Sequence, residues 1–120
     1  MTYQPVLSAS SLEGDDVKNA SGEDLGTIKE IMIDTQTNTV AYYVLSFGGV
    51  LGMGDKLFAL PPEAVSLDKA KKCFILDVDK ERLKSAEGFD KDNWPNMADP
   101  SFRQSIYDHY GYRARTPEVA

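Results

Sequence analysis

Six short apolar segments alternate with clusters of turn-forming residues between Asp16 and Val78, and no long helical pattern separates them. The segments cover residues 16–18, 27–34, 40–47, 57–60, 63–68 and 73–78. Strands joined by short connections pair antiparallel, whereas parallel neighbours need a long crossover, usually a helix. The pattern therefore predicts a mainly β fold, in which six antiparallel strands curl into a small barrel.

The second segment is rich in isoleucine, but its alternation is imperfect. Ile31 and Ile33 share one face of the expected strand, while Ile28 and Met32 lie on the other. Either both faces are covered or a bulge shifts the phase. The third segment is apolar on both faces, so we expect it to be central and to form a hairpin with the second across the polar stretch 35–39.

A glycine-rich stretch from Gly48 to Gly54 connects the third and fourth segments. Its order, Gly-Gly-x-x-Gly-x-Gly before a strand, lacks the strand-to-helix setting of a dinucleotide fingerprint and the terminal Lys-Ser or Lys-Thr of a phosphate loop. It therefore reads as a structural turn. Val50, Leu51 and Met53 form an apolar tip on it, either as a lid on the core or as a contact surface.

Composition narrows the class of protein. The chain has 120 residues, of which 42% are hydrophobic, and this is enough for one domain. Its net charge of -6 disfavours nucleic acid as a partner, because the phosphate backbone is also negative. A single cysteine, Cys73, excludes an internal disulfide. No secretion signal and no apolar stretch long enough for a membrane span is evident, so we expect a cytoplasmic protein without membrane insertion.

The last 32 residues differ in composition from the barrel segments, so we divide the chain into a barrel domain at 1–88 and an aromatic-rich extension at 89–120. A short helix is expected at 79–86, directly after the last strand. Asp99 and Pro100 have the features of an N-cap and first helical position, and Gly111 suits the position after the last turn. These signals predict a helix near 101–110.

The extension supplies most of the candidate contact residues. They are the aromatic and aliphatic side chains Trp94, Phe102, Ile106, Tyr107 and Tyr110. Phe102, Ile106 and Tyr110 fall on one face of the expected helix. This stripe either closes one end of the chain's own barrel or packs on a second subunit, as it would in a homodimer.

Several motifs occur in the order typical of PRC-barrel domains. They are Leu12-Glu13-Gly14, Val17-Lys18-Asn19, Gly22-Glu23-Asp24-Leu25-Gly26, the strand at 27–34, the glycine-rich stretch at 48–54 and the proline that ends the next strand. The chain thus resembles this family, which includes the cytoplasmic domain of the photosynthetic reaction-centre H subunit. The resemblance covers residues 8–89 and implies a barrel of about six strands whose role is to hold other macromolecules.

A non-enzymatic interaction domain is the leading functional hypothesis, with a role as an adaptor or assembly factor that binds protein partners. The alternative is a barrel that binds a small molecule or metal ion at the glycine-rich stretch, with Asp55 and Glu23 as acidic neighbours. We expect no enzyme. A catalytic set with the sole histidine, His109, would need Cys73 as its nucleophile, but Cys73 lies in an apolar strand. No cofactor is implied.

Overall fold

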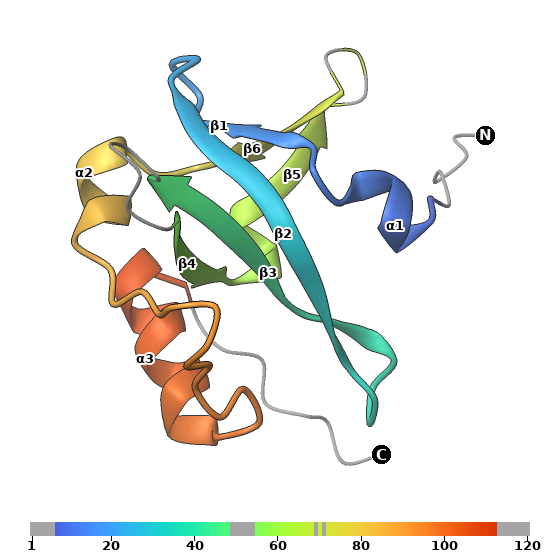
Figure 1. The fold of residues 1–120 in the computed structure, drawn as a ribbon, viewed down its shortest axis with the longest axis vertical. Coiled ribbons are helices and arrows are strands. Elements are labelled where there is room, and N and C mark those ends of the chain that lie inside the picture. The colour runs from blue at the N-terminus through green and yellow to red at the C-terminus, as the bar shows by residue number, and fades with distance from the viewer. Residues whose placement is uncertain (1–6, 49–54, 69, 71, 113–120) are drawn as a thin grey trace.

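The computed structural model describes residues 7–48, 55–68, 70 and 72–112. Six strands within this part of the chain form one sheet in the order β4-β3-β2-β1-β6-β5. Their bounds are β1 Asp16–Lys18, β2 Asp24–Asp34, β3 Thr39–Gly48, β4 Asp55–Leu60, β5 Val65–Asp68 and β6 Cys73–Leu76. The sheet curls into a half-barrel (Figure 1). The β2–β3 hairpin forms its longest strands, and β4 and β5 are its two edges.

The predicted antiparallel barrel is wrong in two respects. β1 and β6 pair in parallel, with Val17 beside Phe74, so the sheet is mixed. Parallel neighbours are usually joined by a helical crossover, but here β2 to β5 themselves form the long connection. In addition, the sheet is open, because β4 and β5 are not paired with each other among the described strands.

The β2–β3 hairpin resolves the imperfect alternation of the isoleucine-rich segment. Its register shifts twice, between Ile28 and Glu30 and between Met32 and Ile33. These irregularities confirm a bulge, one of the two expected explanations. Ile28 is buried in the core, whereas Ile33, near the tip of the hairpin, is 52% exposed.

Short helices frame the sheet. They are α1 (Ala9–Leu12), η2 (Pro62–Ala64), α2 (Lys80–Lys84) and α3 (Pro100–Tyr110). α2 and α3 match the two predicted helices, and the Asp99 side chain accepts a hydrogen bond from the Ser101 amide at the start of α3. Gly111 ends α3 with a φ of 78°, a left-handed conformation that glycine adopts without strain. No sequence signal was assigned to α1, whose N-cap is Ser8.

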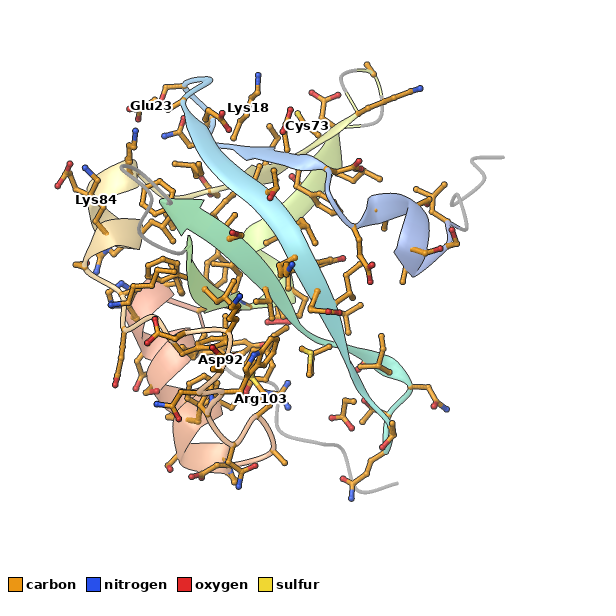
Figure 2. All side chains as sticks on the ribbon, in the orientation of Figure 1. Lys18, Glu23, Cys73, Lys84, Asp92 and Arg103 are labelled. Atoms are coloured by element: carbon orange, nitrogen blue, oxygen red, sulfur yellow. The ribbon has the colours of Figure 1, made fainter. Side chains whose placement is uncertain are left out.

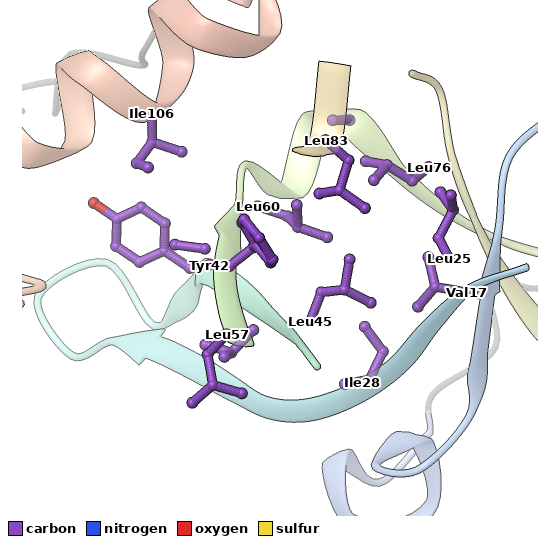
Figure 3. Packing of buried hydrophobic residues seen from close by; sticks show 14 of the residues in the cluster. Val17, Leu25, Ile28, Tyr42, Leu45, Leu57, Leu60, Leu76, Leu83 and Ile106 are labelled. Carbon is purple, nitrogen blue, oxygen red and sulfur yellow. The ribbon is translucent and has the colours of Figure 1, made fainter. Parts of the chain in front are cut away.

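The core lies inside the curl of the sheet. Side chains from all parts of the described chain meet there, and Figure 3 shows Leu45 and Ile28 of the hairpin facing Leu76, Leu83 and Val17. At one end of this cluster, Ile106 of α3 lies opposite the ring of Tyr42 on β3. The helix α3 therefore covers the end of the half-barrel that the strands leave open.

Candidate interaction cleft

Three of the predicted contact residues are core residues. Ile106, Tyr107 and Tyr110 are only 5%, 0% and 7% exposed, so they cannot form an exposed contact surface. Ile106 and Tyr110 belong to the chain's own hydrophobic core. Because a small half-barrel leaves one end uncovered, the apolar face of α3 is needed to close it. The apolar face of α3 therefore packs on the chain's own half-barrel, which is one of the two arrangements expected from the sequence.

Tyr107 is held by a polar contact as well as by burial. Its hydroxyl donates a hydrogen bond of 3.1 Å to Glu63 Oε1, which links α3 to η2. Burial, together with this bond to Glu63, raises the pKa of Tyr107 to about 12. Burial also raises the pKa of Tyr110, whose hydroxyl has no hydrogen-bond partner among the described residues. Both hydroxyls therefore stay protonated at neutral pH.

The other two predicted contact residues of the extension remain partly accessible. Trp94 and Phe102 are half-buried, and both line a surface cleft of about 330 Å³. The ring of Trp94 packs against Phe89 with 5.0 Å between ring centroids, and its Nε1 donates to the Lys91 carbonyl at 2.9 Å. These contacts fix the indole, so its accessible side is a rigid wall of the cleft.

A short backbone pairing places this cleft against the barrel. Leu57 of β4 and Phe89 exchange two hydrogen bonds of 2.9 and 2.8 Å, which add a bridge to the outer edge of β4. Gly88 lies so close to β4 that a Cβ there would come within 2.8 Å of Lys56 Cγ. Only glycine allows this approach. Sequence reasoning did not identify this pairing, because one bridge has no pattern of its own.

Charged side chains surround the aromatic wall. Lys56, Glu87 and Asp90 are exposed and line the same cleft. An apolar centre with a polar, solvent-accessible rim is the usual anatomy of a protein interface. Val50, Leu51 and Met53 lie outside the described residues.

Candidate metal-binding and catalytic side chains are dispersed in the described part of the chain. It contains no group of three or more His, Cys, Asp or Glu side chains that could hold a metal ion. Glu23, which the alternative hypothesis uses as a ligand, accepts a 2.8 Å hydrogen bond from Asn19 Nδ2. Cys73 is buried in β6, and His109 Nε2 lies 2.9 Å from the Arg82 carbonyl oxygen.

Comparison with known protein families identifies the family of this chain. The family model for the PRC-barrel domain matches residues 5–83. The chain belongs to the PRC-barrel domain family. A comparison with curated proteins gave no match.

The PRC-barrel match ends within α2, and this boundary divides the cleft. Lys56 lies in the part of the chain that the family model covers, whereas Asp90, Trp94 and Phe102 lie beyond it. The PRC barrel thus supplies one wall of the cleft, and the segment after α2 supplies the aromatic wall. None of the helices in the described part of this PRC-barrel protein has the length and apolar character to cross a membrane.

Proposed function

We propose that this PRC-barrel protein is a non-enzymatic interaction domain that binds a protein partner as an adaptor or assembly factor in the cytoplasm. The cleft between β4 and the segment after α2 carries the proposal. It combines a rigid, half-buried tryptophan and a phenylalanine with exposed charges of both signs. Tryptophan in a partly desolvated pocket is the residue type that most often dominates binding energy at protein interfaces.

The chemistry of the cleft defines the partner segment. Trp94 and Phe102 accept an aliphatic or aromatic side chain, while Lys56 and Asp90, which line the same cleft, each attract a flanking charge of opposite sign. A protein segment with one apolar anchor between an acidic and a basic residue fits this pattern. A second copy of the chain is one such source, and it would make the protein a homodimer.

Site-specific crosslinking tests this function directly. A photoreactive amino acid at Asn93, which is exposed and lines the cleft, should crosslink a discrete partner in the native host. The matched control carries the same group at Lys29, an exposed position on β2 that does not line the cleft. Mass spectrometry then identifies the partner, including a second copy of the chain.

Substitutions at two cleft residues, Lys56 and Trp94, decide whether the captured partner uses the cleft. Lys56→Glu should weaken the Asn93 crosslink, and Trp94→Ala should abolish it, whereas Lys29→Glu should leave it intact. Trp94→Phe should restore part of the signal, because the apolar anchor is retained. An identical set of crosslinked proteins from Asn93 and Lys29, or a crosslink that survives Trp94→Ala in folded protein, would contradict the proposal.

A further inference from the structure

A second cavity lies between the tip of the β2–β3 hairpin and the start of α3. It measures about 400 Å³, at the lower end of the range for small-molecule sites. Met32 and Ala41 from the hairpin and Met97 from the segment before α3 supply apolar walls. This cavity is separate from the interaction cleft, since no residue lines both.

Two buried polar atoms at this cavity lack partners. Tyr42 and Arg103 both line it, and among the described residues neither the Tyr42 hydroxyl nor Arg103 Nε has a hydrogen-bond partner. Tyr42 is only 1% exposed, so its hydroxyl is removed from bulk water. Buried polar groups are nearly always paired, so these two atoms beside a cavity are free to bind a water molecule or a ligand.

The two groups line the cavity from different elements, Tyr42 from β3 and Arg103 from α3. Figure 2 shows Arg103 reaching from α3 toward the β2–β3 hairpin, and Figure 3 shows the Tyr42 hydroxyl directed out of the core near Ile106. The Tyr42 ring also lies 5.8 Å from the ring of Phe102, the residue before Arg103. Burial raises the pKa of Tyr42, and the charge of Arg103 acts in the opposite direction, as expected of groups within electrostatic reach.

The charges around the cavity limit the charge that a ligand there can carry. Arg103 is the cation at the cavity, and its fork of N–H groups suits a carboxylate. Asp34 also lines the cavity, but its Oδ1 already accepts hydrogen bonds from the Gln36 and Thr37 amides at 2.9 and 3.4 Å. Together with Asp99, which lies near Tyr42, this carboxylate disfavours a dianion such as phosphate.

Arg103 also makes a side-chain hydrogen bond with Tyr107, which acts to lower the pKa of that tyrosine against the stronger effect of burial. The guanidinium carbon lies 5.4 Å from the centroid of the Tyr107 ring, a cation–π contact. Glu63 shares a neighbouring cavity with Arg103, and one of its oxygens accepts the Tyr107 hydroxyl.

We propose that this cavity binds a small monocarboxylate with a short unbranched apolar chain, whose carboxylate accepts hydrogen bonds from Arg103 and Tyr42. The apolar chain lies between Met32 and Met97. Methionine side chains adapt to ligands of varying shape, so a homologous series of acids should be accommodated up to the length of the cavity.

Nuclear magnetic resonance of the full chain tests the site with defined probes. The chain has four methionines, and with methyl-labelled methionine the signals of Met32 and Met97 report on the cavity. Acetate, butyrate and hexanoate should shift these two signals with increasing affinity. Hexanamide, which has the same chain but no charge, should bind about tenfold more weakly or worse, because a hydrogen bond to a charged group is lost.

Three variants separate the ligand site from general effects on structure. Tyr42→Phe keeps the ring but removes the hydroxyl, and it should weaken hexanoate binding several-fold. Arg103→Gln should weaken it by about tenfold or more. The matched control is Lys29→Gln, at an exposed position on β2 that does not line the cavity, which should leave the affinity unchanged.

Three results would overturn the proposal. They are an absence of shifts at Met32 and Met97 with every acid, equal binding of hexanamide and hexanoate, and a hexanoate affinity that Tyr42→Phe leaves unchanged in folded protein. The last readout does not depend on Arg103→Gln, so the test stands even if that variant fails to fold.

Discussion

His109 Nε2 lies 2.9 Å from the backbone carbonyl oxygen of Arg82, and the Arg82 guanidinium donates a 3.3 Å hydrogen bond to the His109 carbonyl oxygen. The two residues thus exchange side-chain to backbone contacts between α2 and the last turn of α3. The Ser85 hydroxyl lies 3.5 Å from the same imidazole nitrogen. This reciprocal contact ties the end of α3 to a helix that directly follows the sheet.

Replacing His109 by alanine should loosen α3 at its carboxyl end. We expect a loss of about 0.5–1.5 kcal/mol in the free energy of unfolding, the usual net value of such hydrogen bonds. Hydrogen exchange should accelerate at the end of α3. The control is Gln104→Ala, which removes a hydrogen bond to Asp108 within α3 only. Equal exchange rates in the two variants would show that the contact with α2 does not anchor the helix.

Gly26 should be irreplaceable for a steric reason. Its φ is 127°, and a Cβ at this position would overlap the Ser46 carbonyl oxygen on β3. Gly26→Ala should therefore cost several kcal/mol or prevent folding, because backbone atoms must move. Gly22→Ala is the matched control, since Gly22 also has a positive φ but open space around it. Chemical denaturation should give a loss of about 1–2 kcal/mol for this control.

The raised pKa of Tyr107 on α3 should make the protein less stable at alkaline pH. The pKa of Tyr107 is raised from 10.0 to about 12 in the folded protein, so above pH 10 the unfolded state binds fewer protons than the folded state. The free energy of unfolding should then fall as pH rises from 10 to about 12. Urea denaturation at stepped pH would measure this slope.

Phenylalanine substitutions distinguish the two buried tyrosines at neutral pH. Tyr107→Phe leaves Glu63 without its hydrogen bond and should cost about 1–3 kcal/mol. Tyr110→Phe removes a hydroxyl that has no partner among the described residues, so it should be neutral or stabilising. Denaturation at neutral pH measures both. Similar losses in the two variants would contradict the assigned role of Glu63.

Removal of residues 89–120 should unfold the barrel rather than release an independent domain. The deletion exposes the core side chains that Phe89, Ile106 and Tyr110 cover, and each buried side chain of this size contributes about 1.5–3 kcal/mol. Circular dichroism of the truncated chain should show a loss of cooperative unfolding. Ile106→Ala provides a graded comparison, with an expected cost of about 2–5 kcal/mol. A truncated chain that unfolds cooperatively would instead support 1–88 as a separate domain.

Local sequence signals predict the structure correctly where neighbouring residues determine it. Asp99 and Gly111 bound α3 because a cap and a left-handed residue act within one turn of the helix. Pro61 follows the last residue of β4, because proline cannot donate a ladder hydrogen bond. The six predicted strands are present in the described part of the chain for the same reason, since apolar runs and turn residues are local features.

Contacts between distant segments were not predictable in the same way. The bridge between Leu57 and Phe89 and the cavity shared by Tyr42 and Arg103 depend on how the sheet curls. An aromatic stripe shows that a helix face is buried, but not whether its own barrel or another subunit covers it. Trp94 and Phe102 were predicted as contact residues and line the cleft, whereas Lys56 was not predicted, because its place at the cleft follows from the close approach of Gly88.

The parallel neighbour of β1 affects the order in which the protein folds. Val17 can meet Phe74 only after the chain from β2 to β5 has been synthesised, so a nascent chain that ends before β6 leaves one edge of its first strand unpaired. Contacts between distant residues form slowly, whereas the β2–β3 hairpin joins neighbouring strands. In pulse-labelled refolding, we expect the amides of this hairpin to be protected before those of β1 and β6. Chaperones that act on unpaired strand edges would therefore meet this chain before its sheet is complete.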